Sequence, residues 1–196
     1  MQNVSYQSIR ALISENPAKA AQDCRVLLKR AEHDAEAYRL LGRALRALGQ
    51  DAEAQQAELE AIDASIFDAD LREAALAIVD NRLEIAEPLL RARLRANPFD
   101  AAAIRMLAEV AGRLGRNPDA EKLLRRAVEL APGFVAARTN LATALHRQNK
   151  TEEALAELDR LNEDDPDSPV HANLRAAVLG RIGEFEEAIA LYEDVL

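Results

Sequence analysis

The side chains with the widest range of chemistry in this sequence are three histidines and a single cysteine. His33, His146 and His171 show no metal-ligand spacing with one another or with Cys24. We therefore interpret the histidines as loop or surface residues. Cys24 falls at a core position of a predicted helix, which favours a buried, inert thiol over a nucleophile. These residues predict no metal site and no cofactor.

The sequence contains none of the short motifs that commonly mark an active site. It lacks the GxxxxGK[ST] phosphate loop, the GxGxxG dinucleotide loop, the HExxH zinc motif and the GxSxG nucleophile elbow. The acidic segment NEDDPDSP, residues 162–169, lacks the glycine and the terminal glutamate of an EF-hand loop, so we interpret it as a solvated turn. We expect that this chain is not an enzyme. A site assembled from distant residues stays open, because such sites are recognised by geometry rather than by sequence order.

Arginine and amide side chains form the one polar pattern that rises above background. They recur on predicted helices, and the residues expected to point the same way are Arg39, Arg43, Arg46, Arg105, Glu109, Arg113, Asn140, Thr143, His146, Arg147, Asn173 and Arg181. Arginine binds carboxylates through charge-assisted hydrogen bonds, so such a face would suit an acidic peptide or a carboxylate-bearing tail. The alternative is an ordinary solvated helix surface, because arginine is also a good helix former. The arrangement of the helices decides between the two.

The helices repeat with a fixed period. Alanines recur 34 residues apart from Ala20 to Ala54 and again through Ala86, Ala120, Ala154 and Ala188, whereas the step from Ala54 to Ala86 is 32. Other small residues recur in phase at Gly42, Ala74, Ala108, Ala142 and Ala176, and prolines recur at Pro98, Pro132 and Pro166. We expect units near residues 1–34, 35–66, 67–100, 101–134, 135–168 and 169–196, with the first degenerate and the last incomplete.

This period and pattern resemble the tetratricopeptide repeat (TPR), in which each unit is a pair of antiparallel helices. The resemblance covers the whole chain and implies an all-α, right-handed α-solenoid that forms one domain. In such arrays the first helix of each unit lines the concave face, which would place the arginine and amide residues in a groove for a protein or peptide partner. The close approach of paired helices would explain Gly42, where a larger side chain would push them apart. The lysine and asparagine pattern with which chaperone-binding repeats hold a C-terminal carboxylate is not reproduced.

Proline, asparagine and glycine predict where the helices begin and end. Asn16, Asn117 and Ser168 each precede a proline, which predicts an N-cap followed by proline at the first helical position. Pro88 lies inside a predicted helix and should cause a kink or a late helix start. The shortened step after Ala54 should bend the stack. Left-handed turns within units are expected at Gly49, Gly115, Asn149 and Gly183.

The overall charge limits the classes of partner. The formal net charge is −9, which argues against nucleic-acid binding, because that needs an excess of lysine and arginine on the binding surface. No apolar run approaches the ~18–20 residues of a membrane span, so we expect no membrane partner. The first residues also lack a charged segment followed by an apolar one, so we see no signal peptide and expect a cytoplasmic protein.

A closer resemblance, to the N-terminal repeats of bacterial TPR-linked sulfotransferases, is carried by three segments: AYRLLGRALRALGQDAEA, AIRMLAEVAGRLGRNPDAEKLLRRAVELAP and NLRAAVLGRIGEFEEAIALYEDVL. It implies that further repeats and a catalytic domain would follow, and that this chain would be a non-catalytic accessory region. A solenoid end normally needs a polar capping helix, so Leu191, Val195 and Leu196 would face an absent neighbour. We therefore expect a fragment of a longer chain, or an end that self-associates or docks another domain.

Overall fold

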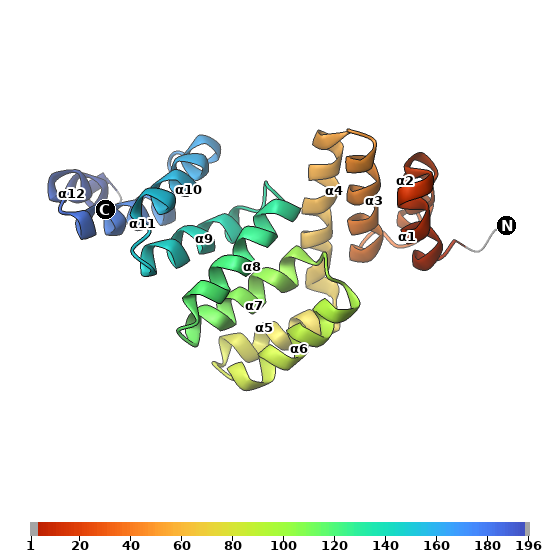
Figure 1. The fold of residues 1–196 in the computed structure, drawn as a ribbon, viewed down its shortest axis with the longest axis horizontal. Helices are drawn as coiled ribbons and strands as arrows, with labels where there is room; N and C mark the ends of the chain where they lie inside the picture. Colours follow the sequence, from red (N-terminus) through yellow and green to blue (C-terminus); the bar gives the residue numbers. More distant parts are fainter. Residues whose placement is uncertain (1–3, 195–196) are drawn as a thin grey trace.

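The computed structural model describes residues 4–194, which form twelve α-helices, one short 3-10 helix and no strand. The helices are α1 (Tyr6–Glu15), α2 (Pro17–Leu28), α3 (Ala35–Ala47), α4 (Asp51–Ala64), η1 (Ser65–Phe67), α5 (Ala69–Val79), α6 (Leu83–Ala96), α7 (Ala101–Arg113), α8 (Asn117–Leu130), α9 (Val135–Arg147), α10 (Thr151–Asp164), α11 (Pro169–Ile182) and α12 (Phe185–Asp194). Consecutive helices pair as hairpins, and the pairs follow one another along a curved array (Figure 1). The prediction of an all-α solenoid is confirmed. No helix in this part of the chain is long and apolar enough to cross a membrane.

Small residues lie where paired helices cross. A Cβ at Gly42 of α3 would lie 3.0 Å from Cγ of Glu58 and 3.3 Å from the carbonyl oxygen of Ala54, both in α4. The predicted close approach at Gly42 is therefore confirmed, and the side chain that lies over it is Glu58. The alanines at the repeat-related positions are all buried: Ala20, Ala54, Ala74, Ala86, Ala108, Ala120, Ala142, Ala154, Ala176 and Ala188.

Left-handed residues make the tight turns within helix pairs. The four predicted turn residues have positive φ, at 72° for Gly49, 74° for Gly115, 91° for Gly183 and 61° for Asn149. Asn81, with φ of 57°, makes the equivalent turn between α5 and α6, and the sequence prediction did not include it. Asparagine tolerates this conformation better than most residues that carry a Cβ.

Some of the predicted helix starts are wrong. Asn16 caps α2 as expected, because its side chain accepts a hydrogen bond from the backbone of the first turn. Asn117 is instead the first residue of α8, and Arg116 holds the N-cap position. Ser168 holds the N-cap position of α11 and Pro169 is its first residue, as predicted, although the Ser168 side chain makes no capping hydrogen bond. Pro88 lies inside α6, which begins five residues earlier, so the late start predicted there does not occur.

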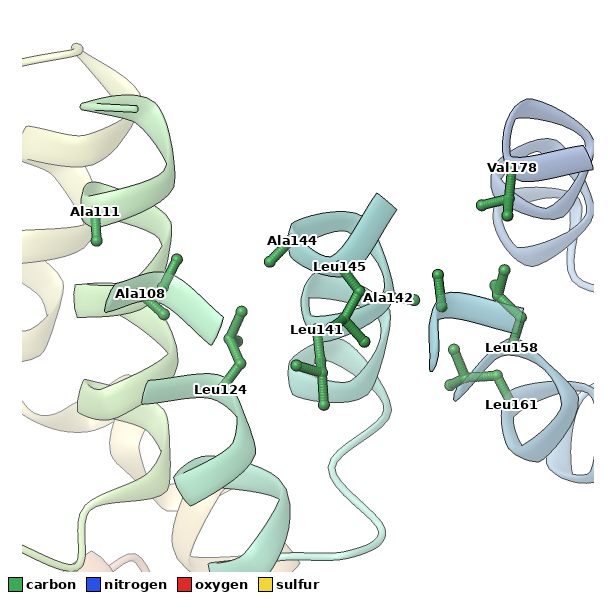
Figure 2. Close-up of a cluster of buried hydrophobic side chains, with 12 residues drawn as sticks. Ala108, Ala111, Leu124, Leu141, Ala142, Ala144, Leu145, Leu158, Leu161 and Val178 are labelled. Carbon is green, nitrogen blue, oxygen red and sulfur yellow. The ribbon is translucent and has the colours of Figure 1, made fainter. Parts of the chain in front are cut away.

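The apolar core runs along the array in separate clusters. One cluster links α7 to α11, and in it Leu141 and Leu145 of α9 lie between Leu124 of α8 and Leu158 and Leu161 of α10 (Figure 2). A second cluster joins α5 to α8, and a third joins α1 to α4. No buried cluster within residues 4–194 spans both α4 and α5.

This interruption has a sequence cause in α4. Glu58 stands where the related helices α2, α6, α8 and α10 carry Cys24, Leu90, Leu124 and Leu158, each of them at most 2% exposed. A carboxylate at this position removes the apolar surface that would cover the next helix, and burying it against apolar neighbours would be costly. Accordingly, α4 packs on η1 and lacks the extensive contact with α5 that joins α2 to α3, α6 to α7 and α8 to α9.

The uncovered surface is visible on α5. Leu76 is 63% exposed, although the residues at its repeat-related positions are buried, namely Ala44, Val110, Ala144 and Val178. In Figure 1, α5 and α6 lie below α7 and α8, offset from the line of α1–α4. The first half of α4 instead lies against the loop before α9, where a Cβ at Gly133 would be 2.7 Å from Nε2 of Gln55. The array therefore consists of an N-terminal stack (α1–α4) and a C-terminal stack (α5–α12).

Charged side chains join the two stacks. We call them the junction cluster, and they are Arg10, Glu36, Arg39, Asp68, Arg93 and Asp100. Asp100 is fully buried, and its Oδ2 lies 3.1 Å from Nη1 of Arg39 and 3.0 Å from Nε of Arg93. Arg39 belongs to the N-terminal stack and Arg93 to the C-terminal stack, so one carboxylate ties both together. Polar contacts thus stand where other neighbouring repeats have apolar stacking.

One residue of the last helix differs from the expectation for an uncapped end. Leu191, predicted to face outward, packs partly against a cluster formed by Ala176, Leu179 and Ala188. Tyr192 of the same helix is 43% exposed. Val195 and Leu196 lie outside the described residues.

Candidate functional site

The predicted groove residues all lie on the first helices of their pairs, but the structure divides them into two groups. Those of α3 contact the junction between the stacks, and most of those of α7 and α9 share one pocket. The two groups have different surroundings, so they are described separately.

The arginines of α3 are largely engaged within the chain. Arg39 is 8% exposed and pairs with Glu36 and Asp100. Arg46 donates to both carboxylate oxygens of Glu58, at 2.6 and 2.7 Å. Arg43 has no carboxylate within 4.0 Å among residues 4–194, and its guanidinium lies 4.2 Å from the ring centre of Phe99.

Five of the predicted residues come together in a pocket of about 270 Å³, which we call the α7–α9 pocket. It is lined by Ala108, Glu109, Gly112, Arg113, Asn117, Ala120, Leu124, Asn140, Thr143, Ala144 and Arg147. Its lining joins three alanines, a glycine and a leucine to six polar or charged side chains from α7, α9 and the first residue of α8. Polar groups placed beside apolar residues fix the orientation of a ligand in a binding pocket.

The charges of this pocket are unbalanced. Arg113 donates to the carbonyl oxygen of Ile78 at 2.6 Å and to Glu109 at 2.7 Å, so its guanidinium is fixed in place. Arg105 reaches the same Glu109 at 3.4 Å. Arg147 makes no ion pair within the described part of the chain. The pocket is thus lined by two guanidiniums and one carboxylate, and Arg105 reaches that carboxylate from outside the lining, which leaves net positive charge in an acidic protein.

Gly112 of α7 and Arg147 of α9 meet in the same pocket. A Cβ at Gly112 would lie 3.5 Å from Nη1 of Arg147, so the guanidinium of α9 lies over the glycine of α7. That distance is an ordinary van der Waals contact, so an alanine at position 112 would fit beside the guanidinium. The sequence prediction did not single out Gly112, because in a helix this glycine is not demanded by a turn.

Amide groups line the pocket beside the arginines. Oδ1 of Asn117 is buried and accepts no hydrogen bond from any described residue. The side chain of Asn140 likewise makes no hydrogen bond within residues 4–194, whereas the hydroxyl of Thr143 donates to the carbonyl oxygen of Thr139 at 3.0 Å. The sequence prediction missed Asn117 as a pocket residue because it assigned that side chain to capping α8.

The other predicted groove residues lie outside this pocket. Burial, Arg181 and Arg147 together lower the pKa of His146, which keeps its ring neutral near pH 7. Arg181 donates to the carbonyl oxygen of His146 at 3.3 Å and to the side chain of Asn149. Asn173 is exposed on α11.

The histidines are not all surface residues. His171 is 3% exposed in α11, and its Nε2 lies 3.4 Å from the hydroxyl of Thr139, so the prediction of a loop or surface position is wrong for it. It stands where Ala37, Ala103 and Ala137 are buried in the related helices. His33 is exposed and stacks on Phe67, with ring centres 4.3 Å apart. Within residues 4–194, no three histidine, cysteine, aspartate or glutamate side chains are grouped as metal ligands would be.

Cys24 should react only after unfolding. It is fully buried in α2, and burial, with smaller contributions from Asp23 and Asp34, raises the pKa of its thiol to about 12. Because the thiolate is the nucleophile, the folded chain should resist iodoacetamide at pH 8.5, where an ordinary thiol is half ionised. Mass spectrometry of the alkylated protein, with and without guanidinium chloride, measures this. Equal rates in the two conditions would contradict a buried inert thiol.

Family models match most of the chain. The tetratricopeptide repeat is matched at residues 8–69 and 71–133 by one model and at residues 113–178 by another. The chain belongs to the tetratricopeptide repeat family. Such repeats generally mediate protein–protein interaction. A search of curated protein sequences found no match.

Solved structures of other TPR proteins share the fold. YrrB, described as a TPR protein with an unusual peptide-binding site, is 20% identical with a TM-score of 0.58, over 89% of this chain and 91% of that one. A TPR protein from Parabacteroides merdae ATCC 43184 is 17% identical with a TM-score of 0.59, over 96% and 76%. A chain of the APC/C hetero-tetramer Cut9-Hcn1 is 15% identical with a TM-score of 0.61, over 93% of this chain and 37% of that one. At these identities the likeness shows the fold alone. The resemblance to sulfotransferase repeats stays a prediction.

Proposed function

We propose that this TPR protein is a non-catalytic scaffold that binds an extended segment of a partner protein in the α7–α9 pocket, and that the segment carries carboxylates. The observation that supports this most directly is the charge of the pocket, whose lining holds the guanidiniums of Arg113 and Arg147 but only one carboxylate, that of Glu109. A carboxylate of the partner would neutralise the excess charge through charge-assisted hydrogen bonds.

Each polar group of the pocket has a defined part in this proposal. Arg147 makes no ion pair within residues 4–194, so its guanidinium is available for a bidentate bond to a carboxylate. Arg113 is held by Ile78 and Glu109 and contributes a fixed charge with little ordering cost on binding. The amides of Asn117 and Asn140 suit the peptide backbone, which offers both a donor and an acceptor. YrrB, which shares the fold, is described as having a peptide-binding site, and that description agrees with this function.

Replacing Arg147 with glutamate should weaken binding of an acidic peptide by about tenfold or more, since losing a hydrogen bond to a charged group costs about 1.5–3 kcal/mol. The probe is a fluorescein-labelled peptide of alternating glutamate and alanine, and the measurement is fluorescence anisotropy. The same peptide with glutamine in place of glutamate should bind far more weakly. Raising the salt from about 50 to about 300 mM should also weaken binding, because it screens the partly exposed charges.

Arg95→Glu is the matched control. Arg95 lies on α6, is exposed and makes no ion pair among the described residues, so this variant changes the net charge by the same amount away from the pocket. We expect its affinity for the peptide to stay within about twofold of the unmodified protein. An equal loss in both variants would mean that overall charge, rather than the pocket, attracts the peptide. If the glutamate peptide does not bind at all, the proposed function is wrong.

A further inference from the structure

The loop between α6 and α7, residues 97–100, lies against α1 and α3 of the N-terminal stack. Nη2 of Arg10 donates to Oδ1 of Asn97 at 3.1 Å. The guanidinium of Arg43 lies 4.2 Å from the ring centre of Phe99, and Nη1 of Arg39 lies 3.1 Å from Oδ2 of Asp100. Arginines of α1 and α3 thus contact an amide, an aromatic ring and a carboxylate of one four-residue segment.

We propose that Arg10, Arg39 and Arg43 form a second recognition site, for short segments in which an aromatic residue directly precedes a carboxylate, and that residues 97–100 occupy it as an autoinhibitory contact. We infer the aromatic and acidic character of the ligand from Phe99 and Asp100, which occupy the site in this chain. A partner segment of the same kind, from another protein, would compete with the loop.

The contact is polar along its length, with Phe99 at the surface and Asp100 and Arg39 buried. A pocket of about 140 Å³ remains between α3 and the loop, lined by Arg10, Glu36, Arg39, Leu40, Arg43 and residues 96–99. Phe99 is 37% exposed, so its ring rests on Arg43 at the surface. The neighbouring repeats of each stack are joined by buried apolar clusters, but no such cluster joins the two stacks within residues 4–194. The loop is therefore held by polar and cation–π contacts, of which the Asp100–Arg39 ion pair is buried.

The positive charge of Arg43 is not neutralised by Phe99, the residue of the chain's own loop that it contacts. Burial lowers the pKa of Arg43; the nearby carboxylate of Glu36 opposes this effect, and Arg10 adds to it. The stacked Phe99 offers a π face but no anion, and no carboxylate lies within 4.0 Å of Arg43 in the described structure. A ligand with an additional acidic residue beside its aromatic ring would satisfy this charge, which gives a partner segment an advantage over the chain's own loop.

The connection between the stacks allows the site to open. Only the short 3-10 helix η1 links α4 to α5 in the chain, and α4 does not stack extensively on α5. Rotation at η1 would withdraw the loop from α3 without breaking the apolar clusters inside either stack. Because the loop is tethered, its effective concentration is about millimolar, so a free peptide competes poorly until the loop is weakened.

The test measures binding of a peptide to the full chain by fluorescence anisotropy. The probe is a fluorescein-labelled, C-terminally amidated peptide that contains Asn-Pro-Phe-Asp, the sequence of residues 97–100. We expect weak binding to the unmodified protein and at least about tenfold tighter binding to the Phe99→Ser variant, in which the tethered competitor is weakened. Adding Arg43→Ser to that variant should remove the gain. A control peptide with Asn-Pro-Ala-Asn should bind neither protein.

A second readout needs no change in the loop. In the protein labelled with para-fluorophenylalanine, the Phe99 resonance is assigned by its loss in Phe99→Ser, and excess peptide should move it as the ring leaves Arg43. A Phe99 resonance that stays fixed at saturating peptide, or a Phe99→Ser variant that melts normally yet binds no tighter, would overturn the proposal. Its failure is separable from that of the α7–α9 pocket, because that pocket is tested with Arg147→Glu and the glutamate–alanine peptide.

Discussion

Replacing Asp100 with alanine is expected to lower the free energy of unfolding by about 3–5 kcal/mol, the usual cost of breaking a buried ion pair by removing one partner. Asp100 is fully buried, and it accepts a hydrogen bond from the backbone N–H of Ala103 at the start of α7. It also holds Arg39 at 3.1 Å and Arg93 at 3.0 Å. In the variant, the guanidiniums of Arg39 and Arg93 each lose one carboxylate partner while they stay largely buried. Urea unfolding followed by circular dichroism measures the loss.

Asp34→Ala separates the cap from the ion pairs. Asp34 stands at the equivalent position of α3 and caps it through the N–H of Ala37, but it takes part in no ion pair among the described residues. This variant should cost about 1 kcal/mol, as the loss of an N-cap usually does, with a small addition for the hydrogen bond from Tyr6. Equal losses for Asp34→Ala and Asp100→Ala would show that the junction cluster adds nothing to stability beyond the cap.

Replacing Leu158 with alanine is expected to cost about 2–5 kcal/mol, because it removes apolar volume from a closely packed site and leaves a cavity. Leu158 of α10 is fully buried in the cluster that links α7 to α11, beside Leu161 and opposite α9 (Figure 2). In a solenoid each repeat contacts mainly its neighbours, so the loss should appear first as earlier unfolding of α9–α12. Hydrogen exchange resolved by segment locates the weakened repeats, and urea unfolding gives the total.

Leu76→Ala is the matched control for this prediction. The repeat pattern alone would rank Leu76 with Val110 and Val178, which are fully buried. In the folded chain Leu76 is 63% exposed, so its truncation should change the free energy of unfolding by no more than about 0.5 kcal/mol. A loss comparable to that of Leu158→Ala would mean that α4 covers α5 in solution, contrary to the interrupted stack.

The sequence by itself determined the features that depend on neighbours within one or two helices. The 34-residue spacing of small residues predicted the helix pairs, and Gly42 predicted the close approach of α3 and α4. The glycines and Asn149 predicted the left-handed turns. These features repeat because each unit packs against its neighbour in the same way, so the same residue type is needed at the same place each time.

The sequence also contains a sign of the interruption between α4 and α5, as a departure from the repeat pattern rather than as part of it. Glu58 breaks the series Cys24, Leu90, Leu124 and Leu158, and aligning that position across repeats would have exposed it. The shortened step after Ala54 predicted a bend there. Neither observation predicts the new contacts that form in place of the missing stack.

Only the tertiary structure decided which arginines are available to a partner. The sequence treated Arg39, Arg46 and Arg147 alike, as members of one helix-face pattern. In the folded chain Arg39 is buried against Asp100 and Arg46 is paired with Glu58, whereas Arg147 opens onto the α7–α9 pocket. Asp100 lies 61 positions beyond Arg39, and their contact depends on the angle between the two stacks. That angle follows from the packing of whole helices, so it cannot be predicted from the spacing of residues along the sequence.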